Sequence, residues 1–112
     1  MKSKIQDFKT KLVCFCAMYD VAMNHNESHE ETGNYGIWYE MGESRLDADS
    51  MTAEKVPVIS VQIWTKDEYS ELPDLFEDFF DRIDCAWDNE TYADYDEELQ
   101  RYHYGWTMTY EG

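Results

Sequence analysis

Apolar residues recur at helical spacing over the first part of the chain. Across residues 4–23 an apolar residue stands at every third or fourth position, at Ile5, Phe8, Leu12, Phe15, Tyr19 and Ala22. Such spacing predicts an amphipathic helix with one buried face. Ser3 and Gln6 have the spacing of a capping box at its start. We therefore expect a first helix over residues 4–23, followed by a polar loop over residues 24–34.

Two further helical patterns lie in the second half of the chain. Residues 72–88 carry an apolar face made of Leu72, Leu75, Phe76, Phe79, Phe80, Ile83, Ala86 and Trp87. Pro73 fits the first turn of this helix, where no backbone donor is needed. A third helix is expected over residues 92–102, with Thr91 as its cap and an inner stripe of Tyr92, Tyr95, Leu99 and Tyr102.

Three other segments have the composition or the alternation of β-strands. Residues 35–41 (YGIWYEM) are rich in aromatic side chains and lie between two glycines. Residues 56–65 (VPVISVQIWT) carry apolar side chains on both faces, which predicts a central strand. Residues 104–112 (YGWTMTYEG) place Trp106, Met108 and Tyr110 on one face. We expect this last strand at a sheet edge, where it could pair two copies of the chain.

The order of these elements is α-β-β-α-α-β, which predicts a single α+β domain over residues 1–112. About three helices would pack on a small antiparallel or mixed sheet. The polar segment at residues 43–55 would connect two strands or extend them. A length of 112 residues suits one domain.

Charge is distributed very unevenly along the chain. The formal net charge is −16, and residues 67–98 hold fourteen Asp and Glu against the single Arg82. Residues 2–11, in contrast, hold four lysines against one aspartate. An excess of acid disfavours direct binding of nucleic acid and of anionic membranes, which both need Lys and Arg.

The acids of residues 74–98 form the candidate binding surface. On the expected helix several of them recur at spacings of three and four, which is roughly 5 Å along the helix axis. Such a row resembles a phosphate array and could occupy a basic groove. The predicted partner-binding residues are Asp74, Glu77, Asp78, Asp81, Asp84, Asp88, Glu90, Asp94, Asp96, Glu97 and Glu98, with Trp87 and Tyr92 as aromatic anchors. The alternative interpretation is an ordinary solvated helix face.

In acidity and length the chain resembles the small acidic inhibitors of phages and mobile elements, which include DNA mimics and anti-CRISPR proteins. This resemblance implies an inhibitor in the host cytoplasm, either a monomer or a homodimer. Its partner would be a basic nucleic-acid-binding protein, such as a CRISPR effector or a restriction enzyme, whose groove it blocks. An alternative is an immunity-type or regulatory module that neutralises a toxin or an enzyme through a few aromatic anchors.

Motifs for catalysis are not found in the sequence. It contains no Gly-rich phosphate loop, no G-x-S-x-G and no H-E-x-x-H. We therefore expect no enzyme activity, no cofactor and no metal. A less favoured hypothesis is a metal-dependent enzyme centred on His25 and His29, which are four positions apart, with nearby acids. The pair Asp47 and Asp49 is a weaker metal candidate.

The chain has three cysteines, Cys14, Cys16 and Cys85. An odd number of cysteines and a lysine-rich start without an apolar run favour reduced thiols in a cytoplasmic protein. Cys14 and Cys16 would point to opposite sides of a helix and would not pair. We expect Cys16 and Cys85 to be small buried hydrophobic residues.

Overall fold

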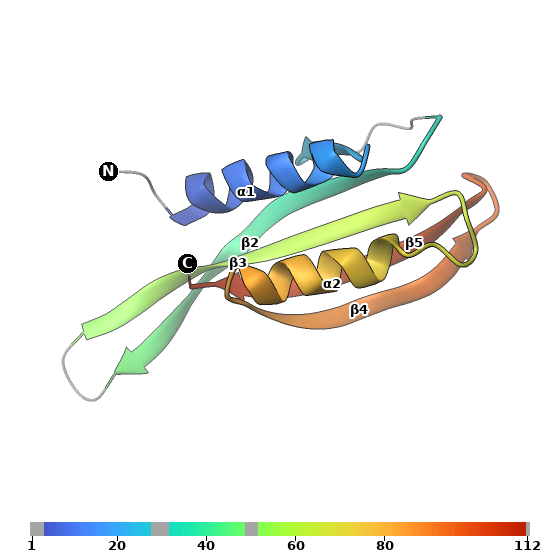
Figure 1. Ribbon diagram of the computed structural model, residues 1–112. Helices are drawn as coiled ribbons and strands as arrows, with labels where there is room; N and C mark the ends of the chain where they lie inside the picture. Colours follow the sequence, from blue (N-terminus) through green and yellow to red (C-terminus); the bar gives the residue numbers. More distant parts are fainter. Residues whose placement is uncertain (1–3, 28–31, 49–51, 112) are drawn as a thin grey trace.

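The computed structural model describes residues 4–27, 32–48 and 52–111, which form two helices and five strands (Figure 1). In chain order these are α1 (Lys4–Met18), β1 (Ala22–His25), β2 (Tyr35–Ala48), β3 (Thr52–Thr65), α2 (Leu72–Arg82), β4 (Cys85–Asp96) and β5 (Arg101–Tyr110). The expected α+β class is confirmed. The expectation of about three helices is wrong, because the described residues form two, in the order α-β-β-β-α-β-β.

The strands form one mixed sheet in the order β1-β2-β3-β5-β4. β1 runs parallel to β2, and the other neighbours are antiparallel. Both helices lie on the same side of the sheet (Figure 1). The sheet therefore has one face under the helices and one face that no described helix covers.

The core lies between the helices and the sheet, and β3 runs through its middle as expected. Ile59, Val61 and Ile63 alternate along β3 and are fully buried. Trp106 lies opposite Val61 on β5 and is also fully buried. Its ring lies 5.8 Å from the ring of Phe76 on α2. The ring contact holds α2 against β5.

The first helix is five residues shorter than expected. α1 ends at Met18, and Asp20 has a positive φ of 55° that turns the chain away. The backbone N–H of Val21 then donates to the carbonyl of Cys16 at 3.0 Å, which closes the end of the helix. Residues 22–25 join the sheet as β1, so the prediction of a loop over all of residues 24–34 was wrong for its beginning. Ser3, the expected cap, lies outside the described residues.

The two later helical predictions fail over residues 83–102. α2 ends at Arg82, Asp84 takes a left-handed φ of 62°, and Cys85 begins a strand. The expected third helix is instead the end of β4, a turn and the start of β5. Tyr95 and Tyr102 are cross-strand partners with ring centroids 4.8 Å apart, rather than neighbours along one helix. Their spacing in sequence fits a helix and a hairpin equally well, and pairing with β5 selects the hairpin.

Strand positions in the sheet also differ from expectation. β5 lies between β3 and β4, so it is not an edge strand and cannot pair two copies of the chain. β1 and β4 are the edges. The described parts of residues 43–55 extend β2 and β3 up to the pair Ala48 and Thr52. Figure 1 shows that this part of the hairpin projects beyond the rest of the sheet.

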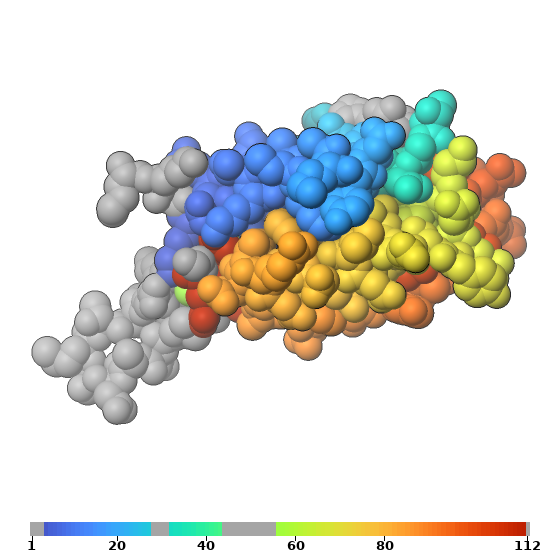
Figure 2. All heavy atoms as spheres, viewed as in Figure 1, coloured from blue at the N-terminus to red at the C-terminus, as the bar shows by residue number. Residues whose placement is uncertain are grey.

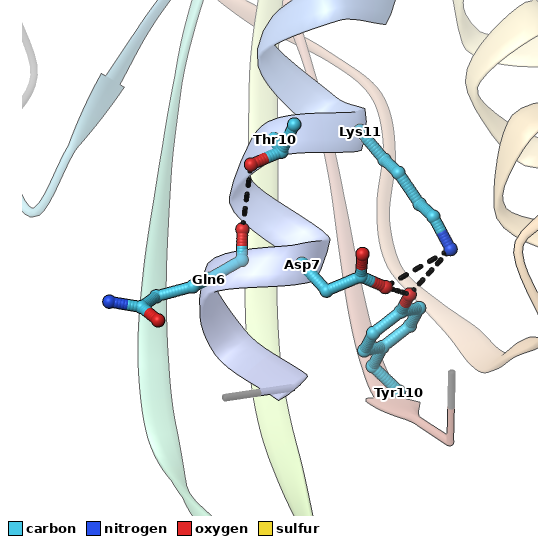
Figure 3. A network of polar contacts seen from close by, with 5 residues as sticks. All are labelled: Gln6, Asp7, Thr10, Lys11 and Tyr110. Atoms are coloured by element: carbon cyan, nitrogen blue, oxygen red, sulfur yellow. Dashed lines mark hydrogen bonds and ion pairs between the residues drawn. The ribbon is translucent and has the colours of Figure 1, made fainter. Parts of the chain in front are cut away.

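A polar contact fastens α1 to the last strand (Figure 3). The hydroxyl of Tyr110 donates to the carboxylate of Asp7. Lys11 Nζ donates to the same hydroxyl at 2.8 Å and lies 3.1 Å from the Asp7 carboxylate. Tyr110 is fully buried, and this burial raises the pKa of its phenol. The contact joins residues from the two ends of the chain.

Backbone conformation in β4 makes a prediction about stability. Ala93 lies where the β4–β5 register shifts and has a left-handed φ of 49°. A Cβ is unfavourable there, so Ala93→Gly is expected to raise the free energy of unfolding by about 1 kcal/mol. Ala86 lies in the regularly paired part of the same strand. There, Ala86→Gly is expected to lower it by about 0.5–1 kcal/mol. Urea unfolding of both variants tests this, and equal losses of stability would contradict it.

Candidate functional site

The predicted acids are spread over α2, the following turn and β4, rather than along one continuous helix. α2 and β4 contact each other, and β4 is an edge strand. The exposed acids of these two elements and of the turn between them, apart from Asp81, are here called the acidic edge: Asp74, Asp78, Asp84, Asp88, Glu90 and Asp94. Figure 2 shows α2 in yellow and orange on the face in view. The acidic edge runs from the outer side of α2 around β4.

The register of β4 extends the acidic edge onto the face away from the helices. Asp88 pairs with Thr107, and Asp94 pairs with His103. The residues beside these partners on β5, such as Trp106, are buried under the helices. Because side chains alternate along a strand, Asp88 and Asp94 lie on the opposite face.

The acidic edge takes part in no ion pair in the part of the chain that the structure describes. Among the described residues, ion pairs join Lys11 to Asp7 and His25 to Glu40. Neither pair includes an acid of the acidic edge. Like charges on two elements in contact repel each other, which lowers the stability of the fold. A partner that supplies Lys and Arg would remove that repulsion.

Two of the predicted partner-binding acids also hold side chains of the fold in place. Glu77 accepts a hydrogen bond from the indole N–H of Trp106 at 2.9 Å. Asp81 accepts one from the indole N–H of Trp87 at 2.8 Å. Both bonds join α2 to strands of the sheet. Trp87 is half-buried and packs against the core, so it is not the free anchor that its sequence position predicted.

The acids at the β4–β5 turn also include one that accepts hydrogen bonds within the fold and two that do not among the described contacts. Asp96 accepts hydrogen bonds from the backbone N–H groups of Glu98 and Leu99, at 3.0 and 3.2 Å, which shapes the turn. Glu97 and Glu98 are exposed in that turn. Among the described contacts, their carboxylates accept no such hydrogen bond. The structure thus brings these residues beside β4 but not onto α2.

Exposed tyrosines accompany the acids on β4. Tyr92 is 69% exposed and Tyr95 is 47% exposed. Tyr92 rests edge-on against Tyr104, with ring centroids 5.3 Å apart. Tyr92 is thus exposed, as a surface anchor must be, and its role in binding stays a prediction; Tyr95 was expected to belong to the core. Aromatic faces beside carboxylates are a favourable setting for arginine.

A row of planar side chains crosses the face that the helices leave open. Tyr35, Trp64 and His103 stack side by side, with ring centroids 5.4 and 4.6 Å apart. His103 Nε2 lies 2.8 Å from Gln62 Oε1. Burial lowers the pKa of His103, and Asp94 opposes this shift. Sequence reasoning found no partner for His103; its alternation with the buried residues of β5 was the available signal.

The described residues of the hypothetical metal site make contacts within the fold. His25 Nε2 lies 2.6 Å from Glu40 Oε1, and its ring stacks on Trp38 at 4.0 Å. His29 and Asp49 lie outside the described residues. Within the described ranges, no group of three or more His, Cys, Asp or Glu side chains is arranged to hold a metal ion.

The cysteines differ strongly in their surroundings. Cys14 is exposed, whereas Cys16 and Cys85 are buried, as expected. Burial raises the pKa of both Cys16 and Cys85 to about 12. Their thiols therefore stay protonated at neutral pH, and Cys14 is the reactive one of the three.

Comparison with known proteins adds no family or relative. No protein-family model matches the chain, and no curated protein matches it in sequence. Neither described helix combines the length and the apolar character needed to cross a membrane.

The two kinds of acid on α2 are predicted to differ in their effect on stability. Glu77→Ala leaves the buried indole N–H of Trp106 without its acceptor, so it is expected to lower the free energy of unfolding by about 1–3 kcal/mol. Its neighbour Asp78 is exposed, and Asp78→Ala is expected to change it by less than about 0.5 kcal/mol. Thermal or urea unfolding of the two variants measures the difference. Equal effects would show that Glu77 does not hold α2 in place.

Proposed function

We propose that this protein is a small acidic inhibitor that binds a basic nucleic-acid-handling protein and blocks its DNA- or RNA-binding groove. The observation that carries the proposal is the acidic edge, a group of exposed carboxylates that no described cation neutralises. A CRISPR effector or a restriction enzyme is the kind of partner that such a surface suits. The protein would act in the cytoplasm of the host cell.

The mechanism is competition for cationic side chains. Arg and Lys that normally hold phosphates would pair with carboxylates of the acidic edge, and charge-assisted pairs of this kind are strong. Tyr92 and Tyr95 offer ring faces on which an arginine can stack between those pairs.

A second candidate function is an immunity-type or regulatory module that neutralises a toxin or an enzyme. The exposure of Tyr92 and Tyr95 supports it, because aromatic anchors often provide most of the binding energy at an interface. The two functions differ in their response to salt. Binding through carboxylates weakens as salt screens the charges, whereas binding through buried aromatic side chains changes little.

Charge reversal tests the acidic edge directly. The triple variant Asp74→Lys, Asp78→Lys and Glu90→Lys is expected to lose capture of the partner from host lysate while keeping its fold. The matched control reverses three exposed acids outside the acidic edge, Glu43, Glu68 and Glu111, and so changes the net charge equally. The control is expected to retain the partner, since its acidic edge is intact. Asp81 and Glu77 are left unchanged because they hold the two tryptophans.

Elution of the captured partner in a salt gradient separates the two candidate functions. A basic nucleic-acid enzyme released by moderate salt supports charge mimicry. A neutral partner that resists salt favours the module with aromatic anchors. If both triple variants bind as the original protein does, the acidic edge is not the binding site.

A further inference from the structure

A groove opens between the two helices, on the face shown in Figure 2. Its volume is about 410 Å³, within the range of pockets that hold small ligands. The floor contains Phe15 of α1 and Phe79 of α2, whose rings stack with centroids 4.4 Å apart. Ile83, just after α2, adds to the apolar lining.

The charges around this groove are opposite in sign to those of the acidic edge. Lys11 and Arg82 line it, and none of the described residues that line it is acidic. This is unusual for a chain with 25 acids and 9 Lys and Arg. Lys11 is already engaged with Asp7 and Tyr110. Arg82 is exposed, and no described ion pair includes it.

We propose that the groove binds a small organic anion with an apolar body and one carboxylate head group. The apolar body would lie over Phe15 and Phe79, and the head group would pair with Arg82, whose planar guanidinium matches a carboxylate. A single negative charge suits the site better than a polyanion, because the surrounding molecule carries a net charge of −16. The proposal does not rest on the proposed function, because none of the acids of the acidic edge lines the groove.

The groove contains its own reporter. Cys14 lines it and is exposed. Burial raises the pKa of the other two thiols, Cys16 and Cys85, to about 12, so they react slowly. Alkylation by iodoacetamide, an uncharged reagent, therefore reports access to Cys14. A ligand seated on the apolar floor is expected to cover that thiol.

Octanoate is the probe, used below its micelle-forming concentration, and 1-octanol is the uncharged control of equal chain length. Octanoate is expected to slow the alkylation of Cys14 several-fold, and 1-octanol to have much less effect. Arg82→Gln is expected to raise the octanoate concentration for half-protection about tenfold, which corresponds to one charge-assisted contact. Lys66→Gln removes an exposed cation outside the groove and is expected to leave protection unchanged.

Circular dichroism and thermal unfolding establish that each variant is folded, with and without the probe. If Arg82→Gln is not folded, Thr10→Glu replaces it, because it adds a repelling acid at an exposed position of the groove. Absence of protection by octanoate would overturn the proposal. Equal protection by 1-octanol, or equal protection of Arg82→Gln, would overturn the assignment of an anionic head group.

Discussion

The indole of Trp106 is fully buried under α2, with the rings of Phe76 and Phe80 5.8 and 5.5 Å away. Its N–H donates to Glu77 of the same helix. Because Trp106 lies on β5, beside the edge strand β4, these contacts fix α2 over the β5–β4 side of the sheet. A buried indole requires a hydrogen-bond acceptor, so an acid on α2 is part of the packing itself. The acidic character of this helix is therefore partly structural.

Because both helices pack on one face of the sheet, the remaining charged side chains of α2 must lie on its outer side. The apolar side of α2 faces the sheet, so its remaining acids lie on the outer side, next to β4. β4 is an edge strand whose carboxylates discourage pairing with another chain. Repulsion within the acidic edge opposes folding, and the aromatic core must offset it.

The sequence predicts those elements whose hydrophobic pattern is compatible with only one kind of secondary structure. Alternation along residues 56–65 is compatible with a strand and not with a helix, and β3 is indeed central. The prediction of helix over residues 83–102 was wrong because Tyr95 and Tyr102 are spaced equally well for one stripe of a helix and for a cross-strand pair. The outcome depends on left-handed residues such as Asp84 and Ala93, and on pairing with β5, which is long-range information.

Site prediction had a similar limit. Composition and position identified the acids, and most of them are exposed. Their division into structural and free carboxylates was not predictable, because it depends on which tryptophan lies within reach of each acid. Glu77 and Asp78 are adjacent in sequence, yet one holds Trp106 and the other faces solvent. Only tertiary contacts distinguish such neighbours.

The acidic edge and the groove share the helix α2, which contributes Asp78 to the first and Arg82 to the second, so they are not electrostatically independent. Asp78 and Arg82 are one helical turn apart on α2, a spacing at which side-chain charges interact. A carboxylate bound at Arg82 would offset a positive charge near the acidic edge and so strengthen its attraction for a basic partner. Linkage requires the reverse as well: a basic partner on the acidic edge would reduce the negative charge near the groove and favour the anion. Opposite charges on one short helix thus make any binding at the two surfaces mutually supportive rather than competitive.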